Sequence, residues 1–200
     1  MRTLFIAGGS ASGKTWLADR IAARLPATRL SQDRFYRDRP DSADGSDRHA
    51  FDFDRPEAID WAGMRDALRT LAAGRDAVVP VYDMTTSKRA GRERKRATGE
   101  VLVVDGTLVL HAPELAGLWD AAVFVRADEA LRRARRTRRD VEERGRLPAD
   151  IARQLDGQVF PAHDRFVEPS AAAADLVLEA DRLLADPEPE IARVLARIAR

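Results

Sequence analysis

The sequence predicts an α/β protein in which a parallel β-sheet carries helices on both faces. Short apolar runs alternate with amphipathic stretches along most of the chain, a pattern typical of β-α-β units. The first apolar run also ends on glycines and leads straight into a helical pattern. The length of 200 residues matches one domain with room for a small lid. We therefore expect residues 1–200 to form a single domain.

The chain begins with a strand, a glycine-rich turn and a helix. Residues 3–7 are apolar, and Leu17, Ile21 and Leu25 follow at the four-residue spacing of one helical face. The elements expected next are a strand at 28–31, a polar loop at 37–50, a helix along Trp61, Met64, Leu68 and Leu71, a strand at 78–82 and an exposed, charged segment at 86–99. Beyond these, strands are expected at 101–104, 121–125 and 176–178, and helices at 129–143, from Pro148 onward and through 191–198.

Composition and charge narrow the class of protein. The net charge is +1, so no overall basic field attracts nucleic acid. Cysteine is absent, which excludes a disulfide scaffold and a thiol nucleophile. The N-terminal apolar run is too short for a signal peptide, and no apolar stretch reaches membrane-spanning length. We expect a cytoplasmic protein with a small-molecule partner and neither nucleic-acid nor membrane partners; a homo-oligomer stays open.

The turn after the first strand reads GGSASGKT and matches the phosphate-binding pattern G-x-x-x-x-G-K-[ST]. Glycines let the backbone curl so that consecutive N–H groups point at phosphate oxygens, and the next helix adds its positive end. Only three of the 34 basic residues are lysines, so the lysine here is informative. The nucleotide-binding residues expected are Gly8, Gly9, Ser10, Ala11, Ser12, Gly13, Lys14 and Thr15. The fold expected is therefore the three-layer P-loop fold.

Asp105 ends the apolar strand 101–104, where a carboxylate can reach the ligand crevice of a parallel sheet. With Thr15 it is a candidate to hold Mg²⁺, directly or through water. Gly106 follows it, so the second carboxylate typical of ATP-hydrolysing motors is missing. No lysine lies in an N/T-K-x-D context, which argues against a GTPase. Transfer of a phosphoryl group to an acceptor hydroxyl remains.

Asp33 is the best candidate for the residue that takes the proton of that hydroxyl. It comes just after the expected strand at 28–31. General-base assistance of this kind contributes about 10²–10⁴ in rate.

An arginine-rich stretch between 129 and 147 is the candidate lid. Arg132, Arg136 and Arg139 fall on one helical face, and arginines that close over phosphates stabilise the transferred charge. A solvated helix accounts for some of the run. A nucleic-acid patch is the other alternative, although no aromatic residues interleave the run and acidic residues dilute it.

Taken together, the motifs resemble the uridine kinase (uridine–cytidine kinase) family, in the wider group with phosphoribulokinase and pantothenate kinase. The blocks that carry the resemblance, in order, are GGSASGKT, SQDRFYRD, FDFDRPEAID, VPVYDMTTSKR, VVDG, RRTRRDVEERGR and QVFPAHDRFVEP. They span most of the chain, from the phosphate loop to about residue 178.

The resemblance implies a P-loop kinase that uses ATP and Mg²⁺ to phosphorylate a nucleoside. By position, Asp33 would be the catalytic carboxylate, and Thr15 and Asp105 would serve the metal. The substrate-binding residues implied are Tyr36, Asp54, Tyr82, Arg136, Arg146 and Gln154. The resemblance adds Arg139 and Arg144 as phosphate-contacting residues and Lys14 as part of the catalytic machinery.

Three departures separate this chain from the family pattern. Ser87 stands where the family has a base-reading histidine, and Asp105 replaces a glutamate. Residues 91–99 lack the alternating apolar pattern of the family's cap hairpin. The resemblance implies uridine or cytidine as the acceptor. The departure at Ser87 leaves a sugar or a pantothenate-like compound as the alternative. A nucleotide-binding regulator is the candidate from a different class.

Overall fold

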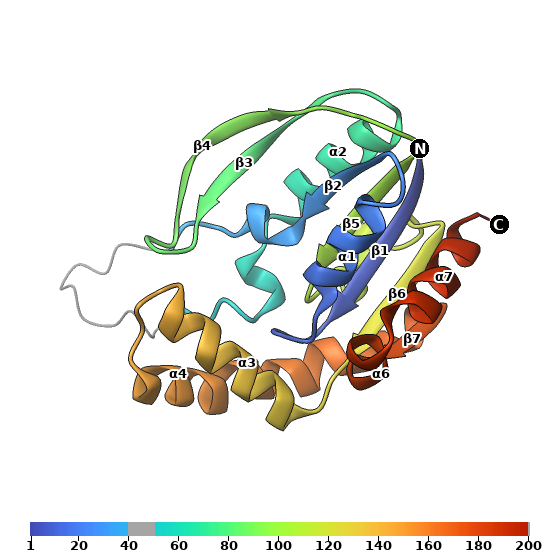
Figure 1. Cartoon of the computed structure of the whole chain (residues 1–200). Coiled ribbons are helices and arrows are strands. Elements are labelled where there is room, and N and C mark those ends of the chain that lie inside the picture. The colour runs from blue at the N-terminus through green and yellow to red at the C-terminus, as the bar shows by residue number, and fades with distance from the viewer. Residues whose placement is uncertain (40–50, 200) are drawn as a thin grey trace.

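The computed structural model describes residues 1–39 and 51–199, so most of the loop expected at 37–50 lies outside the described residues. A five-stranded sheet forms the centre (Figure 1), and every neighbouring pair in it is parallel. In spatial order its strands are β2 (Ala27–Ser31), β5 (Val101–Gly106), β1 (Arg2–Gly8), β6 (Ala121–Arg126) and β7 (Leu176–Glu179). This confirms the predicted parallel sheet and places the strand before the phosphate loop at its middle.

Helices cover both faces of the sheet, as predicted. The helices are α1 (Lys14–Ala22), α2 (Trp61–Ala72), α3 (Glu129–Glu142), α4 (Pro148–Gln154), α5 (Phe160–Ala162), α6 (Ala180–Ala185) and α7 (Pro187–Ile198). Short 3-10 turns lie at Gln32–Phe35, Pro56–Ala58, Pro113–Leu115 and Glu168–Ala173, and π-helical turns at Leu155–Val159 and His163–Val167. Helix α1 ends before Leu25, which the sequence spacing had included, and Pro26 disfavours helical backbone at Leu25 itself.

Two apolar layers, one on each face of the sheet, form most of the core, and a smaller cluster lies around Ile151 and Phe160. Side chains alternate along β1, so Phe5 packs with α2 on one face while Leu4 and Ile6 pack with α1 and α7 on the other. Strands that are covered on both faces read as continuous apolar runs. This is why the central strands could be recognised in the sequence.

A β-hairpin, β3 (Ala77–Asp83) and β4 (Lys88–Lys95), stands apart from the main sheet. The hairpin forms although residues 91–99 lack an apolar alternation, because β4 is held by its backbone pairing with β3. Its side chains are largely exposed, as predicted for the charged segment. Asp83 shapes the turn by accepting a hydrogen bond from the backbone N–H of Thr85 at 2.8 Å.

Helices α3 and α4 pack against one another and lie near the carboxyl ends of the strands (Figure 1). The inward face of α3 is polar, since its buried residues are Arg132, Arg136 and Asp140. This is the arginine-rich stretch predicted as a lid.

Candidate active site

The phosphate loop joins the central strand to α1. Gly8 and Gly13 have positive φ angles of 149° and 106°, which side-chain-bearing residues rarely adopt. A Cβ at Gly8 would lie 2.4 Å from the carbonyl oxygen of Val125, so only glycine fits there. The loop closes through a 3.1 Å hydrogen bond from Ser12 N–H to the Gly9 carbonyl. The backbone thus makes the tight turn that the motif predicted.

Lys14 and Thr15 open α1 at the end of this loop. The Lys14 ammonium lies 3.4 Å from the Gly9 carbonyl oxygen. Burial lowers the pKa of Lys14, and the carboxylates of Asp33 and Asp105 act in the opposite direction. The two carboxylates thus offset only part of the cost of burying the ammonium charge. An anion such as a phosphate would offset more of it.

Asp105 lies at the carboxyl end of β5, 2% exposed. One of its oxygens accepts the Thr15 hydroxyl hydrogen at 2.9 Å, and the other accepts from the Arg29 guanidinium at 2.9 Å. Both carboxylate oxygens are thus engaged by the protein.

These residues fit Mg²⁺ bound together with a nucleotide. Thr15 donates its hydrogen to Asp105, so the hydroxyl lone pairs remain available to a cation. Within 1–39 and 51–199, no three acidic, histidine or cysteine side chains gather into a metal cage. Mg²⁺ typically binds through one or two protein oxygens, water and substrate phosphates rather than through a protein cage. Thr15 would hold the ion, with Asp105 orienting that hydroxyl.

A cavity of about 860 Å³ opens beside the loop. Asp33 lines it from the 3-10 turn after β2, where the Ser31 hydroxyl caps the turn by accepting from Asp33 N–H at 3.3 Å. The Asp33 side chain is exposed to the open cavity, yet the protein atoms crowded around it raise the pKa of its carboxyl by desolvation, against the opposing charge of Lys14. A carboxylate with a raised pKa is a better proton acceptor than an ordinary aspartate.

An aromatic wall faces the cavity from the hairpin side. Tyr36 packs edge-on against Phe53, with ring centroids 5.7 Å apart, and Tyr82 lies 5.5 Å from Tyr36. Burial raises the pKa of Tyr82 to about 12, so its hydroxyl stays protonated. Burial also raises the pKa of Asp54, while Arg136 counteracts this. Flat rings beside hydroxyl and carboxyl groups suit a planar, hydroxylated molecule.

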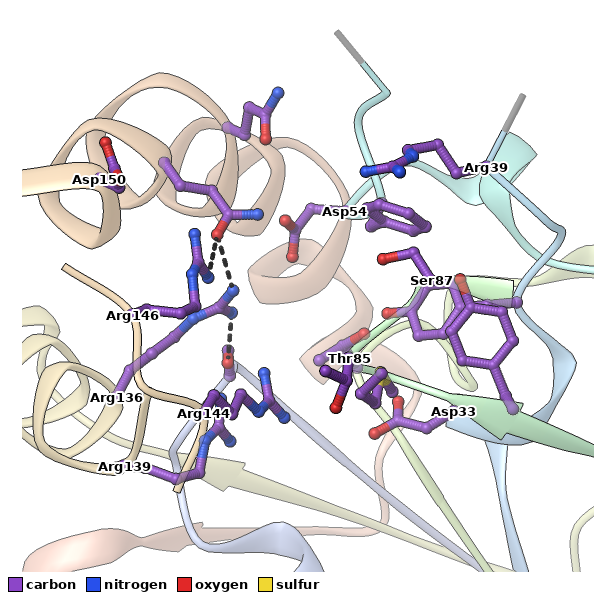
Figure 2. A pocket seen from close by; sticks show the side chains of 18 of the residues that line it. Asp33, Arg39, Asp54, Thr85, Ser87, Arg136, Arg139, Arg144, Arg146 and Asp150 are labelled. Carbon is purple, nitrogen blue, oxygen red and sulfur yellow. Dashed lines mark hydrogen bonds between the residues drawn. The ribbon is translucent and has the colours of Figure 1, made fainter. Parts of the chain in front are cut away.

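Four arginines of the arginine-rich stretch lie across the cavity from Asp33 and Ser87 (Figure 2). This arginine cluster consists of Arg136, Arg139, Arg144 and Arg146. All four lie within 3.5 Å of the fully buried carboxylate of Asp140. Although burial disfavours its charge, the guanidiniums of Arg136 and Arg139 hold the pKa of Asp140 below its ordinary value.

Two further contacts tie the arginine cluster to the rest of the site. Arg136 donates to the Ser10 hydroxyl of the phosphate loop at 2.7 Å. Gln154 on α4 accepts from Arg146 at 2.8 Å and from Arg136 at 3.5 Å. Each guanidinium has five N–H donors, so donors remain for phosphate oxygens. These contacts hold the arginine cluster beside the phosphate loop.

The structure brings most of the predicted site residues to one cavity. Those that line it are Ser10, Lys14, Thr15, Asp33, Tyr36, Asp54, Tyr82, Arg136, Arg139, Arg144, Arg146 and Gln154. Asp105 and the remaining loop residues Gly8, Gly9, Ala11, Ser12 and Gly13 lie outside the lining. Lining residues that sequence reasoning did not select include Arg39, Phe53, Thr107, Asp150 and Gln158.

Comparison with known proteins identifies the group to which this site belongs. Residues 4–183 match the model of the phosphoribulokinase/uridine kinase family. The chain belongs to that family. A uridine kinase of Deinococcus deserti is 36% identical over 176 residues, covering 86% of this chain and 84% of the relative. A uridine kinase of Chloroflexus aurantiacus is 37% identical over 175 residues, covering 86% and 83%.

A solved structure supports the fold of this family member. The putative fructose transport system kinase from Silicibacter sp. TM1040 superposes with a TM-score of 0.66 at 21% identity, over 88% of each chain. The protein is thus a P-loop kinase, a phosphotransferase that acts on an alcohol group, as the motifs predicted. No helix of the described residues is long and apolar enough to cross a membrane.

Proposed function

We propose that this kinase transfers the γ-phosphoryl group of Mg·ATP to a primary hydroxyl of a nucleoside, with uridine and cytidine as the leading acceptors. The supporting observation is that Lys14 of the phosphate loop, Asp33 and the aromatic wall line the same cavity. In this proposal the loop residues bind the phosphates, Asp33 acts as the base and the aromatic wall binds the planar part of the acceptor.

In the proposed reaction, the acceptor oxygen forms a bond to the γ-phosphorus while the bond to the β,γ-bridging oxygen breaks. Asp33 takes the proton of the acceptor hydroxyl, and the products are a phosphomonoester and ADP. Lys14 and the arginine cluster compensate the charge on the transferred group. Mg²⁺, held by Thr15, would supply further charge neutralisation on the nucleotide phosphates.

The direct test is a screen for acceptor-dependent release of ADP. Uridine, cytidine, other nucleosides, simple sugars and pantothenate are each incubated with the enzyme, ATP and Mg²⁺. We expect turnover with a pyrimidine nucleoside. If ADP appears with no acceptor at all, or with none of those tested, the proposed reaction is wrong.

The lid assignment predicts different effects for neighbouring arginines. Arg139→Ala and Arg144→Ala should each lower kcat by about 10²-fold, the usual effect of removing one donor to developing charge. Arg133 is the matched control, because it pairs with Glu129 at 3.0 Å and Asp156 at 2.6 Å on the exposed side of α3. Arg133→Ala should change kcat less than twofold by steady-state assay. Equal losses for all three would indicate a diffuse solvated face instead of a lid.

Ser87 is the position most relevant to the choice of acceptor. It lines the cavity together with Tyr82. A site built to hydrogen-bond one base edge rejects bases that lack it, because its buried polar groups are then left unpaired. Serine is shorter than the histidine of the family pattern, and this specific difference favours another small hydroxylated acceptor as the second candidate.

We therefore expect weak activity on uridine, which Ser87→His should improve. Ser87 has a φ of 56°, and histidine is among the residues that tolerate this conformation. The measurement is kcat/KM for uridine in both proteins. A wild-type value of about 10⁴ M⁻¹s⁻¹ or more, with no gain from histidine, would show that Ser87 does not limit base recognition.

A further inference from the structure

An arginine on the outer strand of the sheet reaches the carboxylate that orients the predicted metal ligand. Arg29 lies in β2, two residues before Ser31, which pairs with Asp105 in β5. Side chains two apart on a strand share a face, so the Arg29 guanidinium approaches Asp105 from the α1 side of the sheet. Its Nη2 donates to Asp105 Oδ1 at 2.9 Å.

Arg29 is itself held from two sides. Its other terminal nitrogen pairs with Asp19 of α1, and only 21% of its side chain is exposed. Its Nε is buried without a hydrogen-bond partner. The guanidinium thus bridges an exposed carboxylate of α1 and a buried carboxylate of β5.

This bridge changes what Asp105 can offer to a cation. Thr15 occupies one carboxylate oxygen at 2.9 Å, and Arg29 occupies the other. Asp105 is absent from the cavity lining, whereas Thr15 is part of it. The Arg29 guanidinium, 2.9 Å from Asp105, also offsets the negative charge of that carboxylate. A divalent cation bound at Thr15 is therefore attracted less strongly.

We propose that Arg29 is a positioning residue of the metal site: it holds Asp105 turned toward the Thr15 hydroxyl and weakens the attraction of the site for Mg²⁺. Thr15 is then the protein ligand, and Mg²⁺ leaves with the product nucleotide more readily than it would from an unpaired carboxylate. The inference rests on the proposed use of Mg²⁺ with a nucleotide.

The test is the binding of ADP by calorimetry, with and without Mg²⁺. The ratio of the two affinities is the Mg²⁺-dependent gain. In Arg29→Met we expect this gain to rise about three- to tenfold, because one unit of opposing charge has been removed near the cation. A merely structural role would weaken both affinities together and leave the ratio unchanged.

Three further variants make the result decisive. Arg29→Gln keeps a donor for Asp105 without the charge, so it should raise the gain as well and replaces Arg29→Met if that variant does not fold. Arg29→Lys keeps the charge and should retain the wild-type gain. Arg24→Met, which removes an arginine paired with Glu188 away from Asp105, is the matched control and should also retain it.

Two results overturn the inference in distinguishable ways. A gain that stays at the wild-type value, or falls, in the neutral Arg29 variants refutes the role of Arg29 alone. Absence of any Mg²⁺-dependent gain in the wild-type protein refutes the proposed metal-nucleotide site and this inference with it.

Discussion

Replacement of Lys14 by alanine is expected to reduce phosphoryl transfer by on the order of 10³-fold or more, because one preorganised cation over the transferred phosphate is lost. The ammonium lines the cavity and makes one long contact, 3.4 Å, to the Gly9 carbonyl. Arginine cannot replace it well, since a planar guanidinium is wider than an ammonium on a flexible stem. Lys14→Arg should therefore recover little activity.

The same substitution should leave folding intact. Burial lowers the pKa of Lys14, so the folded protein disfavours its charged form. Because the pKa of Lys14 is lower in the folded protein, its charge does not stabilise the fold at neutral pH, and its removal costs no stability of this kind. We expect the thermal melting temperature of Lys14→Ala to equal or exceed that of the wild type.

The chain supplies a matched control for Lys14 in another of its lysines. Lys95 ends β4 and lies outside the cavity lining. Lys95→Ala should keep near-normal turnover in the same coupled ADP assay. Substantial turnover in Lys14→Ala, alongside an active control, would show that the loop does not hold the transferred phosphate.

The strands and the phosphate loop could be predicted because their signals are local. The run from Val101 to Val104 is buried, and its unbroken apolar sequence signals this by itself. The phosphate-loop motif likewise specifies its own backbone conformation. Strand β4 gave no such signal. Its side chains face solvent and its order comes from pairing with β3, a nonlocal contact that hydrophobic periodicity does not record.

The buried charges of the site could not be predicted from the sequence either, because nonlocal contacts again decide them. Asp140 and Arg29 look like solvent-exposed residues in an arginine-rich sequence, yet Asp140 is fully buried and Arg29 bridges two carboxylates. Burial of a charge requires partners. Those of Arg29 come from other segments, and those of Asp140 come from both sides of it in the same arginine-rich stretch. Sequence reasoning selected the arginines of the lid but missed the carboxylate that orders them.

Asp33→Asn is the second substitution with a large expected effect, a fall in kcat of about 10²–10⁴. Asparagine has nearly the same shape but cannot take the proton of the acceptor hydroxyl. ADP affinity should change little, since the phosphate loop and the arginine cluster remain. Both quantities need measurement, because Asp33 also interacts electrostatically with Lys14. A loss of kcat below tenfold would remove Asp33 from the role of base.

The pH dependence separates a base from a residue that only shapes the site. Desolvation raises the pKa of Asp33, so the wild-type rate should be full well above that pKa and fall as the pH drops through it, earlier than for an ordinary aspartate. Asp33→Asn should lose this acidic limb and keep a low, flatter rate. Asp156→Asn, which changes an exposed carboxylate paired with Arg133, should retain both the wild-type rate and its acidic limb. An acidic limb that persists unchanged in Asp33→Asn would assign the proton transfer to another group.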